Sequence, residues 1–461
     1  MRQTELIHPT YTESFRCIGP ACEDNCCKGW TIPVDRAAND KFRILPPSPL
    51  RTLIDASIVL TPQSDDGSEP ATFATIRMTA SNVCPLLSED NQCRIHREFG
   101  EAFLPHVCDA YPRIVYSVGD MEEKALALSC PEAARLVLLN PELLNPELLN
   151  PELLDVNHAE ITEPISIYGQ LQGSDHVEGT GSLQPWFWSI RESVLALVLN
   201  RTFPLWQRLF LLGIFCRQLD SIIKGDLKCS VPTFLREFEA SVASGTLLPG
   251  METLPADLAR QLDVVLRLAG MLLHSSNVHP RFVDCIQAFT AGIGNRPGAT
   301  LESLTTQYAL AHERYYEPFF DRQPHILENY LVNTILRCQF PFGREAMRTG
   351  ASPSMTREHA LLIAQFALMK GFLIGVAGFH GGAFSTDHVV HTVQSASKHF
   401  EHHSDFLNQA HALLVESQMD GERGLAILLR NDHPASTRGE KASGLLSRSQ
   451  GTIGASERQS I

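Results

Sequence analysis

The sequence lacks the features of a membrane protein and of a nucleic-acid-binding protein. Its most apolar run, residues 360–379, is interrupted by Gln365 and Lys370, so we expect a buried helix and no membrane span. Lys plus Arg number 38 against 52 Asp plus Glu, which gives a formal net charge of −14. Binding to a phosphate backbone requires clustered positive charge, so we expect no nucleic-acid partner.

A secretory signal is also missing from the first residues. The segment MRQTELIHPTYTESF contains no apolar stretch of the kind that forms the centre of a signal peptide. We therefore expect the chain to work in the cytoplasm, where thiols are kept reduced and structural disulfides are rare.

Cysteine, by contrast, is abundant in one part of the chain. Eight of the twelve cysteines fall in the first 130 of 461 residues, and these eight are Cys17, Cys22, Cys26, Cys27, Cys84, Cys93, Cys108 and Cys130. In a reducing compartment, clustered thiols are more often metal ligands than crosslinks, because thiolate binds zinc and iron–sulfur clusters strongly. We predict a metal centre; the alternative is a set of buried or free cysteines.

The spacing of these cysteines bears on the kind of metal. No C-x2-C pair occurs, although such pairs are typical of structural zinc sites, and Cys84 and Cys130 precede proline, as does the last ligand of a bacterial ferredoxin run. Adjacent side chains diverge, so Cys26 and Cys27 are poorly placed to bind one metal together. We favour a 4Fe–4S cluster, with zinc as the alternative, and the sequence leaves open which four cysteines bind it.

The same spacing argues against radical chemistry. Radical S-adenosylmethionine enzymes hold their cluster with C-x3-C-x2-C, and Cys22 and Cys26 match the first two positions. The third position is Gly29. We therefore expect any cluster to be structural or redox-tuning rather than a radical source, which weakens radical chemistry without excluding it.

Composition divides the chain into four parts and predicts a mainly α fold. Residues 1–137 form an irregular cysteine-rich metal-binding domain, and 138–184 a linker containing NPELLNPELLNPELL, in which each proline interrupts helix formation. In residues 185–431 apolar residues recur at spacings of three and four, which predicts an α-helical domain. Residues 432–461 are small, polar and aperiodic, which is typical of a disordered tail.

Several segments resemble one known family. YTESFRCIGPACEDNCCKGWTIPVD, CPLLSEDNQCRIHREFGEAFLPHVCDAYPRI and LSCPEAARLVL are similar to the N-terminal region of the flagellin lysine N-methylase family, a cysteine-rich zinc- or iron-chelating region. IRESVLALVLNRTFPLWQRLFLLGIFC, ENYLVNTILRCQFPFG and VVHTVQSASKHFEHHSDFL resemble its helical part. The resemblance covers most of residues 11–415.

This resemblance implies an enzyme, a protein-lysine N-methyltransferase that transfers methyl groups from S-adenosylmethionine to lysine side chains of flagellin, the protein of the bacterial flagellum. Such a reaction requires mainly alignment, desolvation and deprotonation of the amine. The alternative is a metal-binding or iron–sulfur interaction or electron-transfer protein without methyl transfer. Its support is that neither GIGNRPG nor GVAGFHGG follows a strand pattern, so both are expected to be helix ends and turns and no nucleotide-binding site.

Candidate residues for cofactor binding fall in two places, and no catalytic residue is identified. Asp109, Tyr111 and Arg113 follow a predicted metal ligand, although ordinary turn chemistry explains them as well. A polar triplet interrupts the helical pattern in the second part, where a helix start is the alternative, and it consists of Glu328, Asn329 and Tyr330. The segment KHFEHH has histidines at helical spacing, which we interpret as a solvated face more readily than as a metal site; they are His399, His402 and His403.

Overall fold

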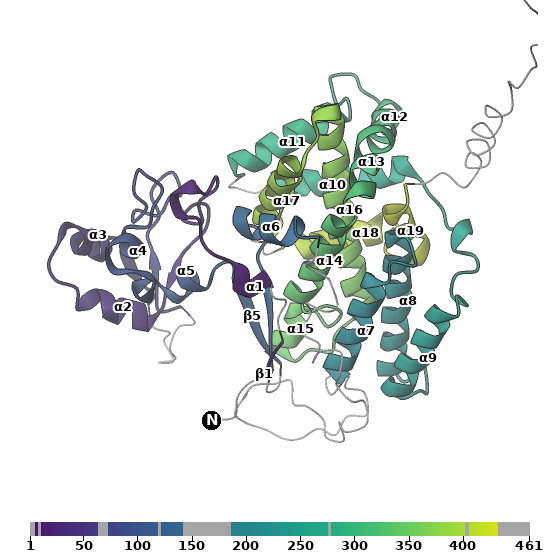
Figure 1. The fold of residues 1–461 in the computed structure, drawn as a ribbon, viewed down its shortest axis with the longest axis horizontal. Helices are drawn as coiled ribbons and strands as arrows, with labels where there is room; N and C mark the ends of the chain where they lie inside the picture. Colours follow the sequence, from purple (N-terminus) through teal and green to yellow (C-terminus); the bar gives the residue numbers. More distant parts are fainter. Residues whose placement is uncertain are drawn as a thin grey trace, which may run out of the picture.

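The computed structural model describes residues 5–7, 11–62, 72–118, 121–141, 186–274, 278–401 and 405–431. These residues form a small module and a large helical body, each with its own buried apolar cluster (Figure 1). The helices dominate and the described strands all precede residue 127, so the predicted mainly α fold is confirmed. Most of the predicted linker and all of the predicted tail lie outside the described residues.

The small module comprises residues 27–108 and packs around Ile32, Phe42, Ile54 and Ile95. Asp35 and Ser48 begin its first two helices, since their side chains accept hydrogen bonds from Ala38 N and Arg51 N. Its sheet has the order β2-β4-β3 and is antiparallel. The elements are β2 (Pro33–Val34), α2 (Arg36–Arg43), α3 (Pro49–Ser57), β3 (Ile58–Leu60), β4 (Ala74–Ile76), α4 (Arg94–Phe99) and α5 (His106–Ala110).

A second three-stranded sheet belongs to the helical body. Its order is β1-β6-β5, with β1 parallel and β5 antiparallel to the central strand. A buried ion pair joins it to the helices, because Arg191 Nε and Nη2 lie 2.7 and 2.9 Å from the two carboxylate oxygens of Glu123. The elements here are β1 (Glu5–Ile7), α1 (Tyr11–Ser14), β5 (Arg113–Val118), β6 (Met121–Leu126) and α6 (Pro131–Leu138).

The rest of the body is an assembly of helices around one long central helix, α16 (Figure 1). Asp220 fixes the start of α16 by accepting hydrogen bonds from Met355 N at 2.8 Å and Thr356 N at 2.9 Å. The helices are α7 (Phe187–Leu199), α8 (Leu205–Ile223), α9 (Val231–Ala243), α10 (Leu258–Leu273), α11 (Pro280–Gly292), α12 (Leu301–Ala311), α13 (Glu317–Arg322), α14 (His325–Arg337), α15 (Arg344–Thr349), α16 (Met355–His380), α17 (Thr386–Phe400), α18 (Phe406–Glu416) and α19 (Glu422–Leu429).

Helix α16 is the buried helix that the sequence predicts. Among the described residues, it is the one helix whose length and apolar character would suffice to cross a membrane, and that apolar stretch is wholly buried inside the fold. Lys370 is buried as well, and its Nζ donates hydrogen bonds to the carbonyls of Leu428 and Leu429 at 3.0 and 2.9 Å. The Lys370 ammonium therefore supplies hydrogen bonds to carbonyl groups that the C-terminal end of α19 leaves without a partner in the helix.

Glycines allow α11 and α16 to approach closely. A Cβ on Gly292 would lie 1.8 Å from the Gly375 carbonyl oxygen, and a Cβ on Gly375 would lie 2.4 Å from the Phe289 ring. Gly375 and Gly378 both lie within α16. The interpretation of GVAGFHGG as helix ends and turns is wrong for these two residues, because their role is a close helix contact.

The large apolar cluster includes residues on both sides of position 137, where the cysteine-rich domain was predicted to end. Tyr11, Phe15, Leu126 and Val137 pack in the same cluster as α7 to α19. The chain therefore leaves the helical body to form the small module and then returns to it.

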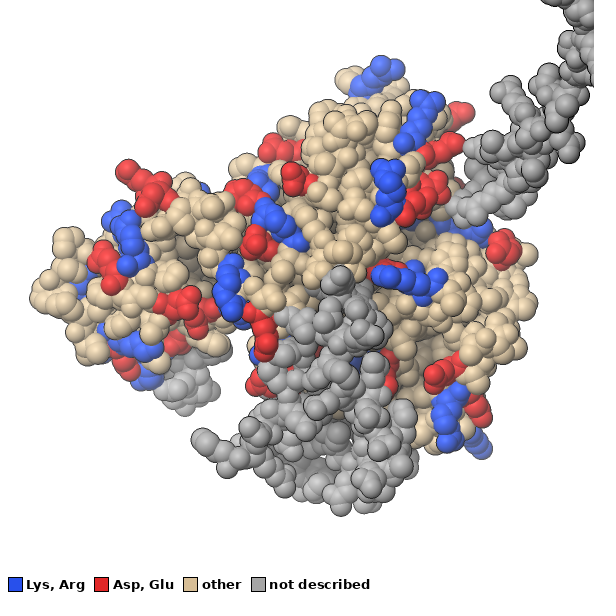
Figure 2. All heavy atoms as spheres, viewed as in Figure 1, with Lys and Arg blue, Asp and Glu red and all other residues tan. Residues whose placement is uncertain are grey.

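Charged side chains of both signs are interspersed over the face seen in Figure 2.

Candidate functional site

A cavity of about 370 Å³ lies between the small module and the helical body, and we call it the cysteine cavity. Cys84 lies just behind this lining, with its backbone N donating to the Cys27 carbonyl at 2.8 Å. The fold thus gathers all eight predicted cysteines in one region. The seven that line the cavity are Cys17, Cys22, Cys26, Cys27, Cys93, Cys108 and Cys130.

The thiols of this cavity differ in their acidity. Cys27 shares side-chain hydrogen bonds with Cys26 and Cys84, and these bonds lower the pKa of both partners. The pKa of Cys26 falls to about 7, with the Lys398 ammonium as a further cause. Burial raises the pKa of Cys22 to about 11 and that of Cys130 to about 12. Cys26 is therefore the thiol nearest to the thiolate form that binds metals.

The structure places the first group of predicted cofactor residues in this cavity. Asp109, Tyr111 and Arg113 all contribute to its lining. The Tyr111 hydroxyl lies 3.1 Å from Ser129 Oγ, and Arg113 donates to the Phe15 carbonyl at 3.1 Å. These contacts fix the position where the chain returns to the helical body.

Within the described residues, no three His, Cys, Asp or Glu side chains are arranged to hold a metal ion. Cys27 is hydrogen-bonded to Cys26 and Cys84, and the other thiols line the cavity without completing such a group. Their chemistry nevertheless suits a soft metal or an iron–sulfur cluster, for which thiolate is the usual ligand. The metal centre and its eight proposed cysteine ligands stay a prediction.

Asp24, between Cys22 and Cys26, connects this region to the helical body. Its carboxylate accepts hydrogen bonds from Lys398 Nζ at 2.8 and 2.9 Å and from Gln394 Nε2 at 2.7 Å. His279 Nε2 lies 3.4 Å from the same carboxylate. The side chain of Asp24 is only 3% exposed, so this carboxylate is compensated by contacts with α17 and with His279, the residue before α11, and not by solvent.

The second group of predicted cofactor residues lies in α14 and makes contacts inside the body. Glu328 is buried and pairs with Arg201 and Arg208 at 2.6 and 2.8 Å. Asn329 Nδ2 donates to the carbonyls of Val137 and Asn140, both at 2.8 Å, and the Tyr330 ring is buried. The alternative of a helix start is confirmed, because α14 begins at His325.

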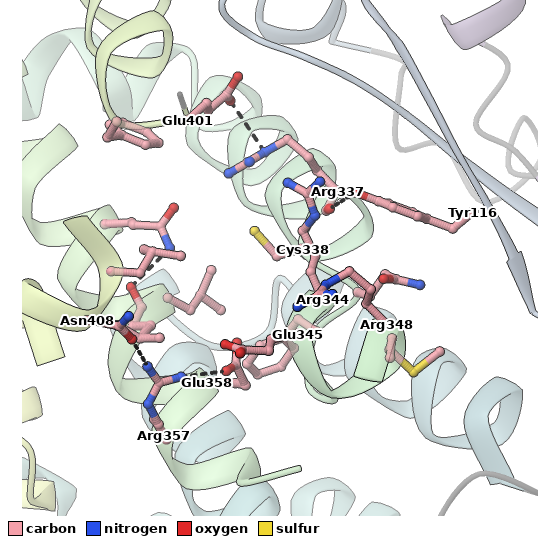
Figure 3. A pocket seen from close by; sticks show the side chains of 18 residues that line it. Tyr116, Arg337, Cys338, Arg344, Glu345, Arg348, Arg357, Glu358, Glu401 and Asn408 are labelled. Atoms are coloured by element: carbon pink, nitrogen blue, oxygen red, sulfur yellow. Dashed lines mark hydrogen bonds and ion pairs between the residues drawn. The ribbon is translucent and has the colours of Figure 1, made fainter. Parts of the chain in front are cut away.

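A larger cavity, of about 870 Å³, opens at the surface of the helical body, and we call it the charged cavity (Figure 3). Charged side chains from several elements surround it, with Tyr116 from β5 at one side. The charged residues are Arg337 at the end of α14, Arg344, Glu345 and Arg348 on α15, Arg357 and Glu358 on α16, and Glu401 after α17.

The deep wall of the charged cavity holds a buried ion pair. Arg337 Nε lies 3.4 Å from Glu401 Oε1, and the two side chains are 7% and 5% exposed (Figure 3). Within the part of the chain that the structure describes, Arg337 Nε has this ion pair but no hydrogen bond. The Tyr116 hydroxyl donates to the Arg337 carbonyl at 2.9 Å, which ties the sheet to this wall.

A second carboxylate, Glu358, lies beneath the loop between α14 and α15. A Cβ on Gly343 would lie 2.6 Å from Glu358 Cδ, and Gly343 has a φ of +84°, a backbone conformation that favours glycine. Burial raises the pKa of Glu358, Arg357 opposes the shift, and neighbouring Glu345 adds to it. Arg357 Nη1 donates to Glu358 at 3.1 Å and its Nη2 donates to Asn408 Oδ1 at 2.8 Å.

Local sequence explains how this loop forms. Helix α14 ends at Arg337, and Gln339 follows with a φ of +52°. The next bond, between Phe340 and Pro341, is cis, and proline cannot continue a helix. The chain therefore turns sharply and returns as α15 along the mouth of the charged cavity.

One interpretation of the histidines is wrong. His399 does not lie on a solvated face: it is buried, its Nε2 lies 2.8 Å from the Leu272 carbonyl oxygen, and its ring stacks on Phe282. His402 and His403 lie outside the described residues. The helical spacing indicated that the histidines share one face of a helix. It did not indicate that α10 and α11 pack against His399.

A family model described as the FliB lysine N-methylase C-terminal domain matches residues 191–428, just over half of the chain. The chain therefore belongs to the FliB lysine N-methylase family, as the resemblance implied. The family is named for lysine N-methylation. Apart from Tyr116, the residues that line the charged cavity lie within the matched range.

Curated relatives are similar over a shorter range. The flagellar biosynthetic protein FliU of Salmonella muenchen is 29% identical over 143 residues, which cover 31% of this chain and 82% of that protein. The lysine-N-methylases of Salmonella typhimurium and Salmonella choleraesuis are also 29% identical over 143 residues, and the match covers 34% of each. The chain thus matches about a third of the length of these two enzymes. No solved structure matches the chain.

Sequence reasoning did not single out the residues of the charged cavity or Asp24. The family resemblance could have indicated the cavity. The family-like segment ENYLVNTILRCQFPFG contains Arg337, and VVHTVQSASKHFEHHSDFL contains Glu401. Asp24 and its partner Lys398 also lie in two of the family-like segments, but they are 374 residues apart, so the sequence does not show that they meet.

Proposed function

We propose that this protein transfers methyl groups from S-adenosylmethionine to the side-chain nitrogens of lysines on flagellin, in the cytoplasm and before export. The observation that carries the proposal is the family match over residues 191–428, within which most of the charged cavity lies. The names of the relatives support the substrate, because one is a flagellar biosynthetic protein and two are lysine-N-methylases.

The chemistry places few demands on the protein. S-adenosylmethionine supplies, when bound, a methyl group on a positively charged sulfur. The protein has to remove the lysine nitrogen from water, take its proton and hold it in line with that carbon. Carboxylates and aromatic rings stabilise the two cations involved, and the chain has both kinds of group in its cavities.

We further propose that the cysteine cavity holds a 4Fe–4S cluster, with zinc as the alternative. The residues fit, since seven thiols line one cavity and the pKa of Cys26 is lowered to about 7, which favours the ligand form. A cluster is larger than a single ion, so its thiolates stand farther apart than the ligands of one ion. In this position a cluster would organise the joint between the small module and the helical body.

The test is the intact mass of flagellin from the same genome, co-expressed with and without this protein. We expect additions of methyl-sized steps that appear only with the protein. Purified components supplied with S-adenosylmethionine carrying a deuterated methyl group should give the correspondingly heavier steps. Unmodified flagellin, with metal present in the purified protein, would instead favour the binding or electron-transfer alternative.

A further inference from the structure

We infer that the charged cavity is the methyl-transfer site: its arginines bind the amino-acid end of a sulfonium methyl donor, and Glu358 accepts the proton of the lysine acceptor. This inference rests on the proposed function and locates the methyl transfer in the structure. Four observations carry it, namely the size of the cavity, its paired charges, its unpaired arginines and its two neighbouring carboxylates.

The size of the cavity suits two reactants. Pockets for drug-sized molecules commonly measure about 300–1,000 Å³, and the charged cavity, at about 870 Å³, is near the upper end. Leu361, Leu362 and Phe400 contribute apolar surface to the lining. The cavity therefore has room for a nucleoside-sized donor together with an extended lysine side chain.

The arginines suit the carboxylate of an amino acid. Arg344 and Arg348 extend from α15 toward the cavity (Figure 3), and among the described residues neither forms an ion pair. The guanidinium of Arg344 lies 5.7 Å from the centre of the Tyr116 ring, which holds it in place. A guanidinium binds a carboxylate through two parallel hydrogen bonds, so these residues can receive the acid end of the donor.

The carboxylates suit the cations. Glu401 is buried in the deep wall, and Glu345 and Glu358 lie close together on the opposite side of the cavity (Figure 3). Negative charge held in a partly dry site stabilises an ammonium or a sulfonium more strongly than it would in water. The cavity thus offers charged partners of both signs, arginines for the carboxylate of the donor and carboxylates for its two cationic groups.

Glu358 is placed to act as the base. Burial and the nearby Glu345 raise its pKa, which makes it a stronger proton acceptor than an ordinary carboxylate. The lysine ammonium gives one proton to Glu358. The neutral nitrogen then forms a bond to the methyl carbon while the carbon–sulfur bond breaks and leaves its electron pair on sulfur. The product is a methylated ammonium and a neutral thioether, and Glu358 later releases its proton to water.

Glu358→Gln tests the base, and Arg344→Gln with Arg348→Gln tests the binding of the donor. Matched controls are Glu239→Gln and Arg236→Gln, exposed residues of α9 inside the family-matched range. Full-length proteins are compared by calorimetric binding of S-adenosylhomocysteine, by kcat for flagellin methylation, and by thermal unfolding as a check of folding.

We expect Glu358→Gln to lower kcat about a hundredfold, to remove the acid limb of the pH–kcat profile, and to leave the Kd for S-adenosylhomocysteine within about threefold. The double arginine variant should weaken that binding at least about tenfold. Folded variants that bind and methylate like the α9 controls would overturn the inference while leaving the proposed function intact. If wild-type protein methylates nothing, the proposed function fails, and binding unaffected by the arginine substitutions then overturns the donor site independently.

Discussion

Asp24 and Lys398 are 374 residues apart in the sequence, and the Lys398 ammonium donates to both carboxylate oxygens of Asp24, at 2.8 and 2.9 Å. The two side chains are 3% and 13% exposed. The pair attaches the segment that carries Cys22 and Cys26 to α17, the helix that leads to Glu401 and the charged cavity. The two cavities are thus connected through one helix.

Removing one partner of this pair should destabilise the joint. Asp24→Ala leaves the Lys398 ammonium without its carboxylate, and we expect a loss of about 3 kcal/mol in the free energy of unfolding. Urea titration measures it. Asp55→Ala removes an exposed carboxylate from its pair with Arg51 and should cost less than about 1 kcal/mol. Equal losses in the two variants would show that the Asp24 pair contributes no more to stability than an exposed ion pair.

Loss of a cysteine ligand should release metal. Cys22→Ser and Cys26→Ser each remove a thiolate donor, and because metal binding is coupled to folding, the small module should also become susceptible to proteolysis. Elemental analysis of the purified proteins gives the iron and zinc content. Cys229→Ser, a change in the helical body away from the cysteine cavity, should retain the wild-type metal. Unchanged metal in both ligand variants would refute their assignment.

A methyl group at Gly375 should separate α11 from α16. A Cβ there lies 2.4 Å from the Phe289 ring and 2.7 Å from its carbonyl oxygen, so the helices must move apart. We expect Gly375→Ala to cost about 1–3 kcal/mol or more, seen as a lower Tm. Gly382→Ala is the matched control, since no atom of the described residues lies within 4 Å of its added Cβ. A Tm for Gly375→Ala equal to that of the control would contradict the close contact.

Buried histidines should make stability depend on pH. Burial lowers the pKa of His359 and of His312 to about 4, whereas the ordinary value is 6.5. Between these values the unfolded chain binds protons that the folded protein does not. The stabilisation is therefore complete above about pH 6.5 and declines as the pH falls toward about 4.

Urea unfolding at about pH 7.5 and about pH 5 measures this decline. His359→Gln removes one of the two rings whose pKa falls to about 4, so the difference in stability between the two pH values should shrink. His274→Gln, at an exposed histidine, should keep the wild-type difference. A decline that is the same in both variants would place its origin in other groups.

The features that sequence reasoning predicted are those encoded by short-range patterns. The apolar run 360–379, interrupted only by Gln365 and Lys370, identified α16 as a buried helix, and the cysteines concentrated before residue 131 do lie in one region, although the metal centre they predict stays a prediction. The features that were missed depend on long-range contacts. Arg337 meets Tyr116 across 221 residues, and Gly375 meets Gly292 across two helices, so no local pattern marks either pair.

The path of the chain gives the proposed metal centre a further effect. Phe15 and Tyr111 both pack against the helical body, and Arg113 donates to the Phe15 carbonyl, so the small module is an insertion whose two ends lie together. A centre with one ligand at the start of the insertion, such as Cys22, and one at its end, such as Cys108, would close a loop in the unfolded chain. Closing a loop of on the order of 100 residues is worth about 4–5 kcal/mol in chain entropy. Metal loading would thus act as a covalent crosslink does, by restricting the unfolded chain.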